Sequence, residues 1–140
     1  MHIYPARIVK DDGGYIARFR DVPEAVTGAT TREETIDLAR DALVTAMDFY
    51  FEDRRQVPPP SAAQRGEIGI ELPPSVSAKV LLLNAMIAAR ITPAELARRL
   101  GTSPQVVTRL VDIQHPTKID AVATALAAIG SRLTLNVEAL

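Results

Sequence analysis

Two side chains in the second half of the chain have the types and spacing to read the edges of DNA base pairs. Gln105 and Arg109 lie four residues apart within Thr92–Leu110, "TPAELARRLGTSPQVVTRL". On a helix this spacing places both side chains on one face, one turn apart. A glutamine can bind N6 and N7 of adenine, and an arginine can bind O6 and N7 of guanine. The pair therefore predicts a helix that enters the major groove of DNA.

The elements that would present this pair are two capped helices separated by a glycine. Thr92 and Ser103 are each followed by proline, which is typical of a helix start. Gly101 lies between the two predicted helices, where the chain must adopt a left-handed backbone to turn. Ala97 is small where the helices approach closely, and Val107 supplies apolar contact between them. The segment therefore predicts a helix-turn-helix.

Other polar and basic side chains of this region are candidates for contacts with DNA. The complete set expected to bind DNA is Arg98, Arg99, Thr102, Ser103, Gln105, Thr108, Arg109 and Lys118. Ser103 and the first amides of the second helix could hold a phosphate, and the cations could neutralise others. Asp112 is on the same face and would repel a phosphate that came close. The alternative interpretation is a small helical bundle with a solvated face.

Charge is divided unevenly between the two halves of the chain. Residues 1–75 contain 9 basic and 13 acidic residues, whereas residues 76–140 contain 7 basic and 4 acidic residues. The net charges are therefore −4 and +3, within a total of −1. A surface that binds nucleic acid needs a basic excess. The opposite signs favour different partners for the two halves.

The first half has the alternation of a small antiparallel sheet. Residues 2–9 and 15–22 are predicted strands, joined by a hairpin turn at 11–14, "DDGG". Residues 24–29 fit a third strand at an edge. Residues 67–73 alternate again and are expected to return to the same sheet, because a lone strand is unstable.

A long helix should follow the third strand. Thr31 and Glu34 have the spacing of a capping box, which predicts where the helix begins. Its apolar stripe should pack on the sheet and comprises Ile36, Ala39, Leu43, Met47 and Tyr50. Its carboxylates lie largely away from that stripe and should form an acidic outer surface; they are Asp37, Asp41, Asp48 and Glu52.

The second half is predicted to be helical as far as residue 130. A first helix is expected after a cap at Ser75 or Ser77, followed by the two helices described above. Residues 117–130 predict a fourth helix that ends at Gly130. Residues 131–140 alternate, which favours a terminal strand paired with a second copy of the chain.

These elements predict an α+β protein of two domains. The first domain, residues 1–74, is a small antiparallel sheet with one packed helix and includes a proline-rich, extended connector at 57–66. The second domain, residues 75–140, is an all-α helix-turn-helix domain with the terminal strand, and it would also mediate dimerisation.

Residue types that could catalyse a reaction or bind a metal are scattered. His2 and His115 are far apart, and the chain has no cysteine. The carboxylates that could be imagined as a metal site are interpreted as turn and loop residues; they are Asp11, Asp12, Asp21 and Glu24. We therefore expect no enzyme activity, metal or cofactor. Without a signal-like N-terminus or a long apolar run, the chain is expected to be cytoplasmic and to have no membrane partner.

Taken in order, three segments of the chain resemble the HicB family of antitoxins, in the subclass that ends in a helix-turn-helix. They are residues 13–53, the run "PPPS" at 58–61, and residues 75–130, which together cover nearly the whole chain. The most family-specific parts are "DALVTAMDFYFED", before the connector, and "TKIDAV", after the motif.

The resemblance implies an antitoxin that neutralises a HicA-type, RNA-cleaving toxin. The N-terminal domain would have a partial ribonuclease-H-like fold without catalytic residues and would cover the basic toxin. The C-terminal domain would bind operator DNA as a homodimer or homotetramer and repress the operon. We expect the toxin to contact acidic and aromatic side chains of the first domain. These candidates are Tyr15, Phe19, Asp37, Asp41, Asp48, Phe49, Phe51 and Glu52.

Two other functions stay open on the sequence alone. The chain could be a stand-alone repressor whose N-terminal domain senses a small molecule, or a nuclease that uses a divalent metal. Stable co-purification with a small basic protein would favour the antitoxin. Metal-dependent cleavage of RNA would favour the nuclease.

Overall fold

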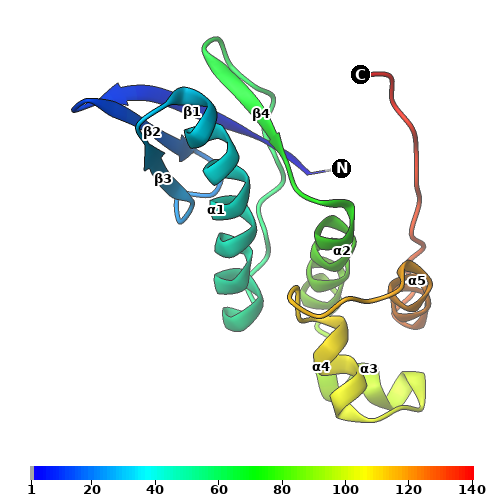
Figure 1. The fold of residues 1–140 in the computed structure, drawn as a ribbon. Coiled ribbons are helices and arrows are strands. Elements are labelled where there is room, and N and C mark those ends of the chain that lie inside the picture. The colour runs from blue at the N-terminus through cyan, green and yellow to red at the C-terminus, as the bar shows by residue number, and fades with distance from the viewer. Residues whose placement is uncertain (1) are drawn as a thin grey trace. The chain divides into compact units, whose positions relative to one another are not determined.

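A four-stranded antiparallel sheet and five helices form the fold, which is described for residues 2–140 in a computed structural model (Figure 1). The chain divides into two compact units, residues 1–77 and 78–140. In chain order, the elements are β1 (Ile3–Asp11), β2 (Gly14–Phe19), β3 (Val26–Ala29), α1 (Arg32–Asp53), β4 (Glu67–Glu71), α2 (Pro74–Ala88), α3 (Pro93–Leu100), α4 (Pro104–Leu110) and α5 (Ile119–Ala128).

The sheet has the strand order β3-β2-β1-β4, and all its neighbouring strands are antiparallel. β1 and β2 form a hairpin whose two loop residues, Asp12 and Gly13, have φ values of 41° and 83°. A two-residue loop with positive φ at both positions matches the right-handed twist of the strands. β4 pairs with β1, so the predicted return of this strand to the first sheet is confirmed.

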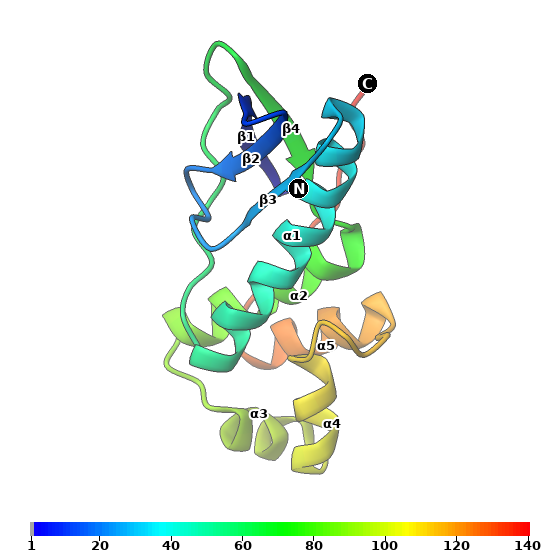
Figure 2. The same cartoon turned by 60° about the vertical axis from the view of Figure 1, so that its left-hand side comes forward.

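The long helix α1 packs on one face of the sheet, mainly over β2 and β3 (Figures 1 and 2). It begins as predicted, because the hydroxyl of Thr31 accepts a hydrogen bond from the Glu34 amide at 3.2 Å. The predicted stripe is buried except for Ile36, which is half-buried. Burial of each large apolar side chain stabilises such a core by roughly 1.5–3 kcal/mol.

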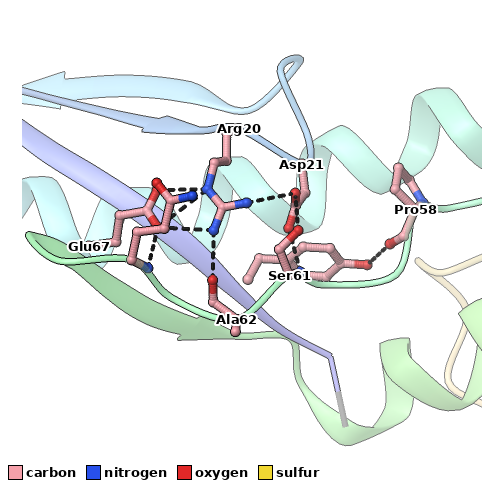
Figure 3. A network of polar contacts seen from close by, with 8 residues as sticks. Arg20, Asp21, Pro58, Ser61, Ala62 and Glu67 are labelled. Carbon is pink, nitrogen blue, oxygen red and sulfur yellow. Dashed lines mark hydrogen bonds and ion pairs between the residues drawn. The ribbon is translucent and has the colours of Figure 1, made fainter.

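The proline-rich connector is held against the sheet by side-chain hydrogen bonds (Figure 3). The Tyr4 hydroxyl donates to the carbonyl of Pro58 at 2.6 Å, and Asp21 accepts from the amide and hydroxyl of Ser61 at 2.7 and 2.8 Å. Arg20 donates to the carbonyl of Ala62 at 2.7 Å and forms an ion pair with Glu67. The connector therefore has a defined path although it contains no helix or strand.

The second unit has its own apolar core. α2, α3, α4 and α5 contribute to one cluster that includes Leu82, Met86, Leu96, Val107 and Leu126. The start of α2 differs from the prediction, because neither serine caps it. The helix begins at Pro74, where a missing N–H costs nothing, and the hydroxyl of Ser77 is buried without a hydrogen-bond partner among residues 2–140.

The prediction of a terminal strand is wrong for a single copy of the chain. Residues 131–140 contain no helix or strand, and Leu135 and Val137 are 77% and 98% exposed. The alternation in this segment is present, but a strand also needs a neighbour to pair its backbone amides and carbonyls. The tail does not find such a neighbour among residues 2–140.

None of the helices in residues 2–140 is individually long and apolar enough to cross a membrane. α2 and α3 satisfy length and composition criteria only when taken together, and they are bent by 103° at the break between them.

We predict that Tyr4→Phe lowers the free energy of unfolding by about 1 kcal/mol, because the carbonyl of Pro58 loses its donor. Burial, with Asp21 and Tyr50 nearby, raises the pKa of Tyr4, so the hydroxyl remains a donor at neutral pH. Urea unfolding measures the change. Tyr15→Phe is the matched control, because no hydrogen bond of the Tyr15 hydroxyl is found in residues 2–140. Equal stability of the two variants would contradict a role for the Tyr4 bond.

Candidate functional sites

The surface of α4 has the arrangement expected of a helix that reads DNA bases. Gln105 and Arg109 are exposed, whereas Val107 and Leu110 on the other side of the helix are 0% and 4% exposed. Burial of this apolar pair fixes the rotation of the helix about its axis. The two long polar side chains, one turn apart, therefore project from a helix whose orientation is fixed by its buried side.

The geometry of the turn between α3 and α4 follows from its caps. The hydroxyl of Thr92 accepts from the Glu95 amide at 3.1 Å, and that of Ser103 accepts from Val106 at 3.4 Å. Gly101 ends α3 with φ 63°, and its N–H donates to the carbonyls of Ala97 and Arg98. Ala97 is 4% exposed. A left-handed residue at 101 is thus needed to change the chain direction between the helices.

Arg98 and Arg99, two of the predicted phosphate contacts, are paired within the chain. Arg98 Nε is 2.8 Å from Glu95 Oε2, and Arg99 Nε is 3.0 Å from Glu95 Oε1. These hydrogen bonds, first from Arg98 and then from Arg99, lower the pKa of Glu95 to about 2. A phosphate must therefore compete with a carboxylate that stays ionised at neutral pH.

The other predicted DNA contacts have different surroundings. Thr108 is exposed, but its hydroxyl donates to the carbonyl of Pro104 at 3.0 Å. Thr102 is half-buried. Lys118 is exposed just before α5 and makes no side-chain cap. The carboxylate of Asp112 accepts from the amide of Gln114 at 2.9 Å, so it has a structural role close to α4.

A buried lysine that was not recognised in the sequence holds the end of α4. Lys79 is 3% exposed, and its Nζ donates to the carbonyls of Arg109, Asp112 and His115 at 3.0, 2.6 and 2.6 Å. Burial lowers the pKa of Lys79, and the nearby Asp112 opposes that shift. The ammonium satisfies carbonyls that the end of the helix leaves unpaired. The sequence does contain one indication of this role, because Lys79 is the single charged residue in the apolar segment "SAKVLLLNAM".

The outer face of α1 carries both carboxylates and apolar side chains. Asp37, Asp41 and Glu52 are exposed, and Asp48 is half-buried. Asp37 forms an ion pair with Arg40 at 2.9 Å. Phe49 is 50% exposed beside these charges. An apolar ring within an acidic surface suits a partner that is basic and partly apolar.

The remaining aromatic candidates are less accessible. Phe19 is 2% exposed and belongs to the core between α1 and the sheet, so it is not available to a partner. Its side chain lies on the side of β2 that α1 covers. Tyr15 and Phe51 are half-buried. Leu38, which the sequence interpretation missed, is 41% exposed on α1 and adds apolar area.

The carboxylates near the sheet stabilise loops. Asp21 accepts from Ser61, and Glu24 accepts from the Tyr50 hydroxyl at 2.7 Å and from Arg55 at 3.2 Å. Burial opposes ionisation of Glu24, but hydrogen bonds from Tyr50, from the backbone amide of Glu24 and from Arg55 together outweigh it and lower the pKa of Glu24. Residues 2–140 contain no group of three or more histidine, cysteine or acidic side chains that could hold a metal ion.

Comparisons with known proteins give one family. Residues 3–81 match the family described as "HicB_like antitoxin of bacterial toxin-antitoxin system". The chain is 54% identical over 132 residues to Antitoxin HicB 2 of Photorhabdus laumondii, covering 94% of each chain. It is 48% identical over 133 residues to Antitoxin HicB of Escherichia coli K12, covering 94% of this chain and 96% of the relative. Antitoxin HicB of Pseudomonas fluorescens is 38% identical over 140 residues, covering 99% and 96%.

We predict that Lys79→Met lowers the stability of residues 78–140 by about 3 kcal/mol, because three carbonyls at the end of α4 lose a charged donor. Hydrogen–deuterium exchange should become faster in α4 and in residues 111–117. Lys118→Met removes an exposed lysine from the same unit and should leave exchange unchanged. Unchanged exchange in the Lys79 variant would show that the ammonium does not hold α4.

Proposed function

The chain belongs to the HicB-like family of bacterial antitoxins, and from this premise we propose that residues 1–74 neutralise a HicA-type, RNA-cleaving toxin while residues 75–140 repress the operon. Such antitoxins are partners of a toxin and are not enzymes. The sheet with its single covering helix would correspond to a partial ribonuclease-H-like fold. The two halves would act on different partners, in keeping with their net charges of −4 and +3.

The outer face of α1 is the proposed surface for the toxin. This proposal is supported by the exposed ring of Phe49, which lies on α1 with exposed carboxylates that include Asp41 and Glu52. The charges would steer a basic toxin into encounter, which mainly raises the association rate. Phe49 and Leu38 would supply buried apolar area, which mainly slows dissociation.

The face of α4 that carries Gln105 and Arg109 is the proposed DNA-reading surface. The observation that supports it is the burial of Val107 and Leu110 on the opposite side, which turns Gln105 and Arg109 toward solvent, where they are free to enter a groove. The α3–Gly101–α4 arrangement would then act as a helix-turn-helix. A homodimer or homotetramer would present two such helices to half-sites roughly 34 Å apart, or a multiple of that distance.

Co-expression with the product of the adjacent gene tests the whole proposal. The expected result is a stable complex with a small basic ribonuclease whose activity on RNA is suppressed. A chain that binds DNA but no such protein would instead be a stand-alone repressor. Metal-dependent cleavage of RNA by the purified chain would make it a nuclease.

We predict that the double change Asp41→Lys and Glu52→Lys slows association with the toxin about tenfold at low salt and weakens the salt dependence of the rate. Stopped-flow measurements at several salt concentrations give both quantities. The double variant Asp120→Lys and Glu138→Lys makes the same change of charge within residues 78–140 and should associate normally. Phe49→Ala should instead increase the dissociation rate. An association rate that is unchanged at every salt concentration would exclude electrostatic steering by α1.

We predict that Arg109→Ala weakens operator binding by about 1–3 kcal/mol and relaxes the preference at one base position. Gln105→Ala should relax a neighbouring position, since the two side chains lie one turn apart. Anisotropy titrations on the operator and on single-base variants of it measure both effects. Arg132→Ala removes a cation from the tail and serves as the control. Footprints and base preferences identical to the parent in both variants would refute this recognition face.

A further inference from the structure

The sheet face opposite α1 contains a hollow with an unbalanced positive charge. Side chains alternate along a strand, so Tyr4 and Ala6 face α1 while Arg7 and Val9 face away from it. A cavity of about 420 Å³ opens on this second face. Arg7, Val9, Arg18 and Val26 form its floor, and we call these four residues the arginine hollow.

Two guanidinium groups of the hollow belong to directly opposed residues. Arg7 on β1 pairs in register with Arg18 on β2. Like charges at opposed positions of an antiparallel pair destabilise the sheet. A sheet that keeps such a pair has a positive potential at that point unless an anion lies above it.

Glu67, the one acidic side chain at the hollow within residues 2–140, offsets this charge only in part, because it attracts Arg7 but is hydrogen-bonded to Arg20. Glu67 lies at the wall of the hollow and is opposite Arg7 in the β1–β4 register, but its oxygens accept from Arg20 and from the Gln64 amide (Figure 3). Arg20 is thereby neutralised. Arg7 makes one long contact, to the carbonyl of Arg65 at 3.5 Å. Within residues 2–140, no hydrogen bond or ion pair is found for the side chain of Arg18.

Aliphatic surface lies beside the free charge. Val9 and Val26 are 42% and 43% exposed and come from β1 and β3, on either side of Arg18. A ligand for this hollow must therefore offer an anion and apolar groups within a short distance. The fork of one guanidinium group matches the two oxygens of a carboxylate, and the second guanidinium adds positive charge beside it.

We propose that the arginine hollow binds the carboxylate of an acidic and aliphatic peptide segment that belongs to a protein partner. The charge of the surrounding unit favours a peptide over a nucleic acid, because residues 1–75 have a net charge of −4 and would repel a polyanion. Of the described residues that line the hollow, only Phe19 is aromatic, and because it is 2% exposed it offers no ring for base stacking.

This site is separate from the surface proposed for the toxin. α1 covers one face of the sheet (Figure 2), whereas Arg7, Arg18 and Val26 of the hollow alternate onto the other face. A peptide in the hollow would therefore not compete with a protein on the outer face of α1. The hollow gives the N-terminal unit a second binding function that does not depend on the toxin.

The test uses the full chain and two labelled peptides, VELEV and its uncharged counterpart VQLQV, in fluorescence anisotropy titrations. We expect VELEV to bind and VQLQV to bind at least tenfold more weakly, because only a carboxylate can pair with the guanidinium groups. Arg18→Gln and Arg7→Gln should each weaken VELEV at least tenfold. Arg40→Gln removes an exposed arginine from α1 and should have no effect.

Stability measurements separate loss of the site from loss of the fold. Arg18→Gln removes a repulsion between opposed strands, so its unfolding midpoint in urea should be equal to or higher than that of the parent. Weak peptide binding by a fully folded variant then supports the proposal. If the variant were to unfold, Arg18→Lys, which keeps the charge but not the fork, should bind VELEV with intermediate affinity.

Five results would overturn the proposal. VELEV does not bind, or VQLQV binds equally well, or both arginine variants bind VELEV as the parent does. A five-nucleotide single-stranded RNA that binds in an Arg18-dependent manner, and displaces VELEV, would assign the hollow to nucleic acid. A change of oligomeric mass in Arg18→Gln, measured by light scattering, would assign it to a second copy of the chain.

Discussion

The sheet of the N-terminal unit is covered by a helix on one face only, and this constraint determines how the rest of the unit is built. α1 buries the apolar side chains of β1 and β2 beneath one stripe, so its opposite side must be solvated, and that side carries the carboxylates. Within residues 2–140, no second layer of helices or strands covers the other face of the sheet. Arginines and a connector held by hydrogen bonds border it instead, and each of these groups tolerates water.

In the second unit, the proposed DNA-reading helix α4 is positioned by apolar burial and by a buried charge. α4 has seven residues, which is too short for a helix to be stable by itself in water. Its orientation comes from two buried aliphatic side chains and from the ammonium of Lys79 at its C-terminal end. The charge is tolerated inside the unit because three carbonyl oxygens surround it, as buried charges require. An apolar core residue at 79 could fill the space but could not pair these carbonyls.

The features that the sequence predicted correctly are those set by neighbouring residues. Thr31 caps α1, Gly101 turns the chain between α3 and α4, and Gln105 and Arg109 are exposed on one side of α4. Each depends on spacings of a few residues. The return of β4 to the sheet followed from the requirement that a strand have a neighbour.

What the sequence did not predict depends on partners that are distant along the chain. Nothing local indicates that Lys79 reaches the carbonyl of His115, 36 residues away. The alternation in residues 131–140 could not show whether a pairing strand is present. The sequence did not show that Arg7 and Arg18 are neighbours, because this depends on the register in which β1 and β2 pair. Glu95 changed the interpretation of Arg98 and Arg99, because a cation in the sequence need not be free to bind phosphate.

The state of these cations bears on how the proposed repressor would bind DNA. Residues 76–140 contain seven basic residues, of which Lys79 is buried and Arg98 and Arg99 are bound to Glu95. One copy therefore offers few unpaired cations, and the affinity for DNA rises with the number of phosphates that are neutralised. A second copy would double both the cations and the proposed base contacts without any new residue. The ion pairing that would make each copy alone a weak ligand for phosphate is thus a physical reason for the proposed oligomer.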